Sequence, residues 1–372
     1  MPVLNLISNS GEASASIHHV HMHIEQQLRV KGIIVESLLL SGVPHKDFGA
    51  PLVRDFDALR RPRKHPIGYR VLRSRLRRRL EQGDYDCIIA DGLLSANLLM
   101  DLQRSLSLDG KFILVVHGRV RIKKTKLPAL FKFIERGRIA GWRVIAVSSD
   151  SARHLEPQLP PELGSIDVVE NCIDADELAE GLLDRDVARR ALGLAPGAVV
   201  VGTIGRMSSE KDYETLVRGF AAANIPGAVL AMVGDGKERQ ALQALAAGLG
   251  ISGQVIFSGY MAKAYRYLRA FDCFVMTSKT EGSPIALLEA MAAARPVVCS
   301  DIPPLIDALP YQYSFVFEQG NATALARQLE AMVGLTAENR DALGSSLESM
   351  TRERFSPALF GEKYSALVKR QG

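Results

Sequence analysis

Short apolar runs alternate with helix-like segments along nearly the whole chain, and this alternation limits the possible fold more than any other feature. The runs CIIA, FILVV and RVIAV are almost continuously hydrophobic. Such runs are typical of parallel strands in a sheet that helices cover on both faces. The repeated strand–helix pattern therefore predicts an α/β fold built on parallel sheets.

The alternation falls into two series, and each series predicts one doubly wound domain. A chain of 372 residues also suits two domains of ordinary size. We expect an N-terminal domain over residues 1–180 and a C-terminal domain over 181–355, with a last helix near 356–370 that crosses back to the first domain. The strands are expected near residues 2–8, 33–40, 86–90, 112–116, 144–148 and 166–170, and then near 198–204, 228–233, 254–257, 272–276, 296–299 and 314–317.

Composition and cysteine spacing indicate an ordinary folded protein of a reducing compartment. Hydrophobic residues make up 47% of the chain and charged residues 23%. The cysteines show neither a C-x-x-C pair nor a zinc spacing, so we expect reduced core cysteines. No basic segment precedes an apolar run at the N-terminus, and no stretch approaches the ~20 apolar residues of a membrane span. These features predict a cytoplasmic protein. The four cysteines are Cys87, Cys172, Cys273 and Cys299.

Basic residues are concentrated in two segments of the first half. Residues 58–80 contain ten Arg or Lys and no acidic residue, and residues 111–143 contain ten more with only Glu135. Such segments can be solvated basic faces. They can also bind an anionic membrane surface, here through 60–79 and 119–138, or a phosphorylated acceptor. Few aromatic residues lie among the arginines, which disfavours nucleic-acid binding by stacking.

A glycine and two cations follow the first strand of the second series. That strand ends at Gly205, which is followed by Arg206, a polar loop and Lys211. Glycine lets a ligand approach the backbone, and the two cations suit a diphosphate. Solvated loop cations are the alternative interpretation.

The next strand leads into Gly234-Asp235-Gly236, half of a dinucleotide-binding pattern. Neither this turn nor Gly202-x-x-Gly205 completes G-x-G-x-x-G, so a nicotinamide cofactor is disfavoured. A tight strand–helix turn explains the glycines without a ligand.

A further strand ends at Ser278, and Glu281-Gly282-Ser283-Pro284 then leads into a helix. Free N–H groups at a helix start, together with the helix dipole, form an anion site. Glu289 lies about two turns further on, roughly on the face of Glu281. These acids can accept hydrogen bonds from sugar hydroxyls, although isolated carboxylates here are more often dipole partners and exposed helix residues.

The run from Gly205 to Asp301 resembles the retaining GT-B glycosyltransferases of family 4. The shared pattern is G-R, E-K, a G-x-G turn, V-x-F-x-G, and E-G-x-P within E-x7-E, in that order. The resemblance implies a GT-B fold, with two Rossmann-like domains facing across a cleft. It also implies an N-terminal domain that binds the acceptor and a C-terminal domain that binds a nucleotide-sugar donor, with no cofactor and no essential metal.

The resemblance assigns roles to matching positions. Arg206 and Lys211 would hold the donor diphosphate, Glu281 would face the donor sugar, and Glu289 would accept the ribose hydroxyls. His117 matches a family histidine near the transferred sugar. The implied catalytic set consists of His117, Arg206, Lys211 and Glu281. The implied donor site also includes Gly11, Gly205, Gly259, Tyr260, Met261, Gly282, Ser283, Pro284 and Ile285.

Four histidines cluster near the N-terminus. His19 and His23 are four residues apart, as a helical metal site requires, but no further ligand at matching spacing completes one. We expect no metal there and assign His18 and His19, with Asn171, to the acceptor side. The chain departs from the family pattern at Asp212 and Cys172, where the family has glycine. The four histidines are His18, His19, His21 and His23.

Two other functions remain open on the sequence. A GT-B nucleotide-sugar epimerase would need acid and base groups around the sugar, and a non-catalytic binding protein would bind the donor without turnover. For a transferase, the basic first half favours a lipid-linked, phosphate-bearing acceptor such as lipopolysaccharide core, at the inner face of the cytoplasmic membrane. We expect a UDP- or GDP-linked donor, and the sequence does not name the sugar.

Overall fold

The computed structural model describes residues 1–8, 15–43, 49–54, 57–61, 63–108, 110–117, 142–158 and 166–369. The predictions for Gly11 and for the basic segment 119–138 lie outside these residues. The chain forms two compact units. The N-terminal unit contains residues 1–172 and 357–372, and the C-terminal unit contains residues 173–356.

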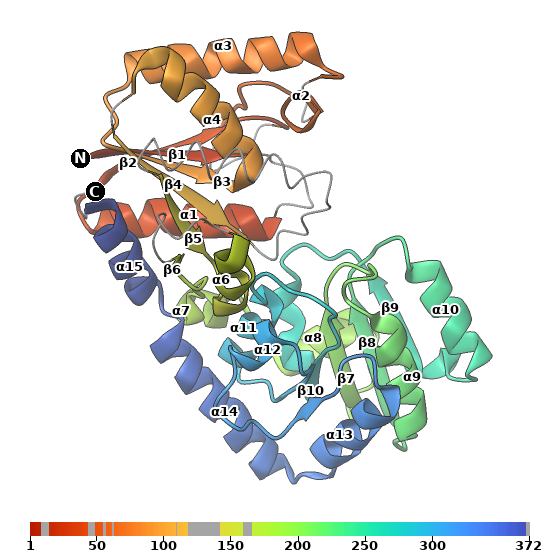
Figure 1. Cartoon of the computed structure of the whole chain (residues 1–372). Helices are drawn as coiled ribbons and strands as arrows, with labels where there is room; N and C mark the ends of the chain where they lie inside the picture. The colour runs from red at the N-terminus through yellow and green to blue at the C-terminus, as the bar shows by residue number, and fades with distance from the viewer. Residues whose placement is uncertain are drawn as a thin grey trace. The chain divides into compact units, whose positions relative to one another are not determined.

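The N-terminal unit is built on a parallel six-stranded sheet of order β2-β1-β3-β4-β5-β6 (Figure 1). Its helices pack against the sheet and cover its apolar strands. The strands are β1 (Pro2–Ile7), β2 (Ile34–Leu39), β3 (Cys87–Asp91), β4 (Lys111–Val116), β5 (Trp142–Ala146) and β6 (Asp167–Val168). The helices are α1 (Ala15–Val30), α2 (Asp57–Arg60), α3 (Pro66–Gln82), α4 (Gly92–Leu106), α6 (Ser149–Leu155) and α15 (Pro357–Lys369).

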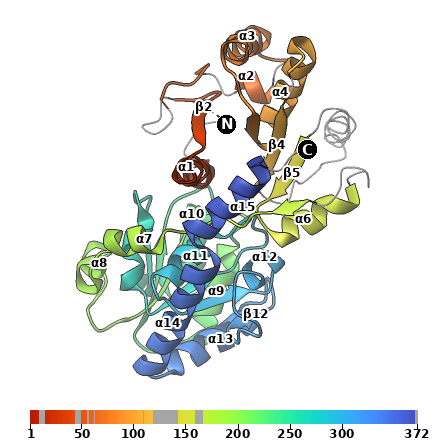
Figure 2. The ribbon, with the colours of Figure 1, turned by 90° about the vertical axis from the view of Figure 1, so that its left-hand side faces the viewer.

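Alternate residues of these strands enter two apolar cores, one on each sheet face, because side chains alternate along a strand. Leu4 and Leu6 of β1 belong to one core, and Val3 belongs to the other. The second core also holds Phe360 and Tyr364 of α15. The last helix of the chain therefore completes the N-terminal unit, and both views place it beside α1 (Figures 1 and 2).

The C-terminal unit repeats this architecture with the strand order β12-β11-β10-β7-β8-β9, also parallel throughout. Its strands are β7 (Val199–Ile204), β8 (Ala228–Val233), β9 (Val255–Gly259), β10 (Cys273–Met276), β11 (Val297–Ser300) and β12 (Val316–Phe317). Its helices are α7 (Ala175–Gly181), α8 (Arg185–Ala191), α9 (Tyr213–Ala223), α10 (Arg239–Gly248), α11 (Ile285–Ala292), α12 (Pro303–Ile306), α13 (Ala322–Gly334) and α14 (Ala337–Arg354), with a 3-10 segment, η5 (Ala264–Ala270).

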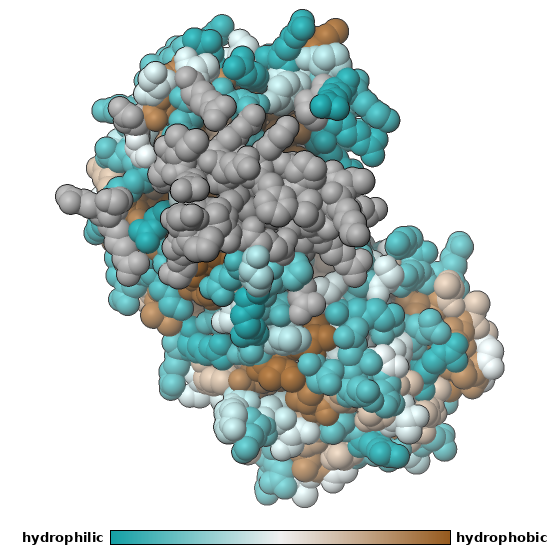
Figure 3. Space-filling view, in the orientation of Figure 1, coloured by the Kyte–Doolittle hydropathy of each residue, from teal (hydrophilic) through white to brown (hydrophobic). Residues whose placement is uncertain are grey.

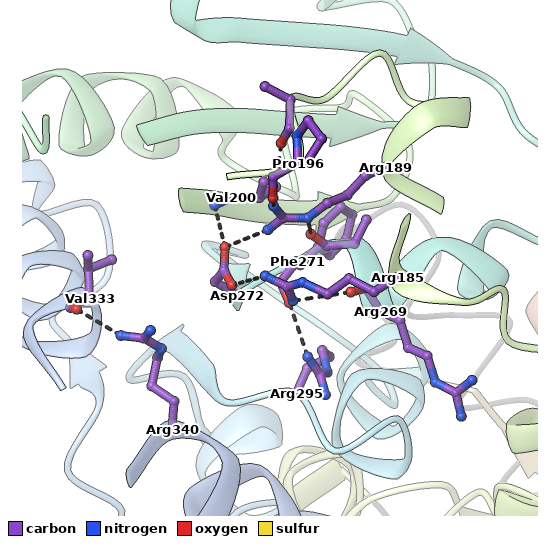
Figure 4. A network of polar contacts seen from close by, with 12 residues as sticks. Arg185, Arg189, Pro196, Val200, Arg269, Phe271, Asp272, Arg295, Val333 and Arg340 are labelled. Atoms are coloured by element: carbon purple, nitrogen blue, oxygen red, sulfur yellow. Dashed lines mark hydrogen bonds and ion pairs between the residues drawn. The ribbon is translucent and has the colours of Figure 1, made fainter. Parts of the chain in front are cut away.

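A buried arginine fixes α8 to the sheet of the C-terminal unit (Figure 4). Nη2 of Arg189 lies 2.9 Å from Oδ2 of Asp272, and the same oxygen accepts the N–H of Val200 at 2.7 Å. Nε of Arg189 also donates to the Ala270 carbonyl, and Arg185 binds the second oxygen of Asp272. The carboxylate thus joins α8 to β7 and to the residue that precedes β10.

The predicted α/β class and both six-stranded sheets are confirmed. The described division after Cys172 lies earlier than the expected boundary at 180, because α7 packs against α11 of the C-terminal unit. All four cysteines are buried, and none of them forms a disulfide. Among the described helices, none is long and apolar enough to cross a membrane.

Candidate active site

The carboxyl end of β7 carries the first group of expected donor residues. Gly205 donates its N–H to the Val233 carbonyl at 2.9 Å, which joins the end of β7 to the end of β8. Arg206 follows as an exposed cation, and Lys211 lies half-buried at the far side of the loop. The charge of Arg206 is close enough to Lys211 to act on its pKa. The two expected diphosphate cations therefore lie near each other at one sheet edge.

The Gly234-Asp235-Gly236 turn packs directly against this loop. Gly234 has a φ of +139°, and a Cβ atom there would lie 1.9 Å from the Gly205 carbonyl oxygen. The N–H of Met207 donates to the Asp235 carbonyl at 2.8 Å. The glycines are explained by the close approach of two backbones, in agreement with the structural interpretation of this turn.

Lys211 forms the central ion pair of the site. Its Nζ lies 2.7 Å from Oε1 of Glu281, which precedes α11. Burial alone would lower the pKa of Lys211, but the Glu281 carboxylate outweighs this effect and raises it. Lys211 therefore stays charged, and residues 70 positions apart in the sequence are brought into direct contact.

Asp212 explains how the chain tolerates the loss of the family glycine. Its φ of +49° and ψ of +46° are left-handed, a conformation in which Asp is one of the few acceptable replacements for Gly. Its carboxylate accepts the Thr215 hydroxyl at 2.8 Å and lies 2.8 Å from Nζ of Lys279. Thr277 donates to the carbonyls of Lys211 and Asp212. Contacts with Thr215, Thr277 and Lys279 therefore hold the loop that presents Lys211.

The segment before α11 differs in detail from the expectation. Pro284 is the N-cap of α11, so it stands at the junction between the segment and the helix. The N–H of Ile285 donates to the Ser283 carbonyl at 3.0 Å, so it is already engaged. Proline has no N–H, and the expected anion donors among residues 282–285 are therefore Gly282 and Ser283.

Glu289 lies half-buried on α11, and burial raises its pKa to about 7. Among the residues that the structure describes, no cation offsets this effect of burial on the charged form. A carboxylate in this state is suited to accept hydrogen bonds from a ligand that covers it.

The expected nucleobase loop lies beside the glycine turn. Gly259 accepts the N–H of Gly234 at 2.9 Å and has a φ of +75°. Tyr260 is 72% exposed, whereas Met261 packs against the core. The ends of β7, β8 and β9 thus form one continuous edge, as expected for a ligand site on parallel strands.

In the N-terminal unit, the structure adds an aspartate that the sequence analysis missed. His117, directly after β4, places Nε2 3.3 Å from Oδ1 of Asp91, the last residue of β3. A carboxylate that ends the apolar run CIIA was the available signal. His18 and Asn171 are buried, and His19 is exposed on α1. In the described part of the chain, the group of side chains that could hold a metal consists of His21, Asp91 and His117. His19 and His23 do not belong to it.

Two units, each with a parallel six-stranded sheet and helices, have the Rossmann-like architecture of the GT-B class. Comparison with known proteins agrees in each half. The model described as Glycosyltransferase Family 4 matches residues 19–177, and the model described as Glycosyl transferases group 1 matches residues 184–346. The chain belongs to the GT-B glycosyltransferases of the family 4 type.

Curated relatives match about half of the chain and about half of their own length. A lipopolysaccharide core biosynthesis glycosyltransferase of Rhizobium meliloti is 34% identical over 177 residues, which cover 47% of this chain and 49% of that protein. A D-inositol 3-phosphate glycosyltransferase of Nocardia farcinica is 33% identical over 206 residues, which cover 52% and 45%. Anabaena HepE, solved with UDP and glucose, has a TM-score of 0.80 at 19% identity over 99% of both chains, a likeness of fold.

Proposed function

We propose that this chain transfers a sugar from a nucleoside-diphosphate donor to a hydroxyl of a glycan or glycolipid, with retention of the anomeric configuration. The observation that carries the proposal is the Lys211–Glu281 pair, which joins a phosphate-type loop to the start of α11. A structural neighbour, Anabaena HepE, has been solved with UDP-glucose, which supports a nucleotide-sugar donor.

In the proposed reaction the acceptor hydroxyl attacks the anomeric carbon from the face that the diphosphate leaves. The bond from the anomeric carbon to the diphosphate oxygen breaks, and the diphosphate takes the proton of the acceptor hydroxyl. Arg206 and Lys211 stabilise the charge that develops on the diphosphate, which is electrostatic catalysis by pre-oriented cations. The N–H groups of Gly282 and Ser283 add to this stabilisation.

The remaining residues bind and orient the donor. Glu281 faces the sugar hydroxyls, and Glu289 accepts the ribose hydroxyls. Tyr260 lines the nucleobase. His117 donates a hydrogen bond to the transferred sugar or stabilises charge that develops on it. His18, His19 and Asn171 belong to the proposed acceptor side.

A thermal-shift screen with UDP, GDP, ADP and their sugars identifies the donor class. Proton NMR of the reaction then tests the proposal, because the coupling constant of the anomeric proton reports retention. Free sugar isomers formed without an acceptor would instead indicate an epimerase. Donor binding without turnover on any glycan acceptor would indicate a binding protein.

An envelope glycan is the proposed acceptor, used at the inner face of the cytoplasmic membrane. The relatives include lipopolysaccharide core glycosyltransferases of Rhizobium meliloti. The outer face of α3 supports an anionic acceptor or membrane, because it exposes arginines beside Ile67 and Val71 while Leu72, Leu76 and Leu80 are buried. Hydrophilic side chains cover this part of the unit in Figure 3. The exposed cations on α3 and just before it are Arg60, Arg61, Arg63, Lys64, Arg70, Arg75, Arg77 and Arg78.

A further inference from the structure

Three side chains from three elements meet at the carboxyl end of the N-terminal sheet. His21 comes from α1, Asp91 ends β3, and His117 follows β4. One nitrogen or oxygen atom of each lies within 4.8 Å of the others. Nε2 of His117 is 3.3 Å from Oδ1 of Asp91, and Nε2 of His21 is 4.0 Å from the same oxygen. These three residues are called the His–Asp–His cluster below.

His21 is held as a neutral ring whose Nε2 carries a lone pair. Its Nδ1 lies 2.6 Å from Oδ1 of Asn5. The Asn5 amide is fixed in this orientation, because its Nδ2 donates to the His21 carbonyl at 3.2 Å and to the Ser37 hydroxyl at 3.0 Å. Nδ1 of His21 must therefore be the donor, which leaves Nε2 unprotonated. The ring is fully buried, which favours this neutral form.

Asp91 is a buried carboxylate that stays ionised, with only 3% of the residue exposed. Its Oδ2 accepts the N–H and the hydroxyl of Ser8 at 3.0 and 2.6 Å. These two hydrogen bonds favour the ionised form of the carboxyl group. Oδ1 is left facing the two imidazoles.

The His–Asp–His cluster contains more hydrogen-bond acceptors than donors. Oδ1 of Asp91 and Nε2 of His21 both present lone pairs to the same point. A proton on Nε2 of His117 can serve one of them and leaves the other without a donor. Within the described residues, Nε2 of neither histidine makes a hydrogen bond of ordinary geometry. Buried lone pairs beside a buried carboxylate are costly unless a positive partner lies among them.

We propose that the His–Asp–His cluster binds one divalent transition-metal ion of the zinc class. Two imidazole nitrogens and a carboxylate oxygen are ligands that zinc prefers, whereas magnesium and calcium prefer oxygen ligands alone. Ligand atoms about 2.0–2.1 Å from a tetrahedral zinc lie roughly 3.4 Å apart. The 3.3 Å separation at His117 fits this spacing, and the 4.0 Å separation at His21 requires only a small rotation of one ring.

The surrounding contacts also fit a metal site. Histidine ligands usually donate the other ring N–H to a fixed acceptor, as His21 does to Asn5, and ligating carboxylates are themselves hydrogen-bonded, as Asp91 is to Ser8. The bound ion takes Nε2 of His117 and so competes with the sugar contact proposed for this residue. Metal binding itself does not depend on the proposed transferase activity.

The test is Co²⁺ and Zn²⁺ binding to the full chain after removal of metal by a chelator. We expect one Co²⁺ per chain with visible d–d absorption, and displacement of Co²⁺ by Zn²⁺. His21→Gln and Asp91→Asn abolish the absorption. Asn5→Ala, which removes the contact to the far side of the His21 ring together with the bonds of Asn5 to the His21 carbonyl and Ser37, weakens Zn²⁺ binding about 10–100-fold. His19→Ala, on the exposed side of the same helix, is the matched control and binds as the wild type does.

X-ray absorption of the wild-type Zn²⁺ complex gives a second readout that needs no variant, and two imidazole ligands are expected. Absence of a one-to-one complex, or binding that persists in both His21→Gln and Asp91→Asn, overturns the proposal and leaves water as the occupant. Nucleotide binding, measured on the same samples, reports on the C-terminal unit and separates this outcome from failure of the proposed transferase function.

Discussion

At the scale of single residues, Asp212 occupies a left-handed position at which the resemblance to family 4 implies a glycine. The position needs a positive φ, and Asp supplies it while binding Thr215 and Lys279. The sequence could identify the departure from the pattern. It could not reveal the compensation, because both partners of the carboxylate come into contact with it only in the folded chain.

We predict that Asp212→Gly keeps the fold and donor binding, because glycine adopts the left-handed conformation without strain. Asp212→Val should lose stability by at least about 1–2 kcal/mol from the backbone alone, because the left-handed region penalises residues with a Cβ and branched ones most. Thermal unfolding and nucleotide titration of both variants check this. Equal losses in the two variants would contradict it.

Glu289 gives a pH dependence to donor binding. Burial raises its pKa to about 7, so the carboxylate that we propose accepts the ribose hydroxyls is present mainly above that pH. We expect donor affinity to rise between pH 6 and pH 8, and Glu289→Gln to bind more weakly with little pH dependence. Calorimetric titrations at several pH values measure this. A wild-type affinity that is flat across the range would count against the role of Glu289.

The raised pKa of Glu289 also makes the stability of the fold depend on pH, in the direction opposite to that of donor affinity. In the folded chain Glu289 keeps its proton at pH values at which the unfolded chain has already released it. Protonated Glu289 therefore stabilises the folded state at low pH, and this stabilisation is lost as the carboxyl group ionises. The free energy of unfolding should therefore fall, relative to Glu289→Gln, as the pH rises from about 5 to about 7. Urea unfolding of both forms measures the difference.

At the scale of elements, the strands could be predicted from the sequence. Buried parallel strands are continuous apolar runs, so β3 and β4 could be found directly. In α14 only Gly344, Leu347 and Thr351 are buried, and its remaining residues are mainly polar. A helix with so narrow an apolar stripe has little periodicity, and only its packing against α11 explains it.

The attachment of α8 makes a prediction about stability. Asp272→Ala leaves the guanidinium of Arg189 buried without its carboxylate, and breaking a buried pair from one side costs about 3–5 kcal/mol. Asp184→Ala, also at α8 but exposed, should change stability by less than about 0.5 kcal/mol. Denaturant unfolding compares the two. Similar small effects would show that the pair does not hold α8 in place.

At the scale of the whole molecule, the distribution of charge matters more than its sum. The chain carries a net charge of +5, and the basic face of α3 is exposed. The position of this segment on a helix could be predicted, because leucines at helical spacing indicated the buried side. The contacts of the cluster around Asp91 could not, since they join three elements that are distant in the sequence.

We predict that the double change Arg70→Glu and Arg78→Glu weakens binding to anionic phospholipid vesicles at low salt by at least tenfold, since each nearby cation contributes about 1 kcal/mol. The control is Arg190→Glu with Arg218→Glu, on exposed positions of the C-terminal unit. Each double variant lowers the net charge by four, from +5 to +1. Equal losses in vesicle co-sedimentation would indicate attraction by net charge and no docking face.

Sugar transfer from the identified donor by the wild type, Lys211→Ala and Arg206→Ala tests the central claim most directly. Nucleoside-diphosphate release and glycosylated product are measured together, with Arg218→Ala as an exposed-cation control. The account predicts a loss of about 10²–10³-fold or more in turnover for each site variant, with unchanged thermal stability of the N-terminal unit and near-normal turnover of the control. Near-normal turnover in both Lys211→Ala and Arg206→Ala would contradict it.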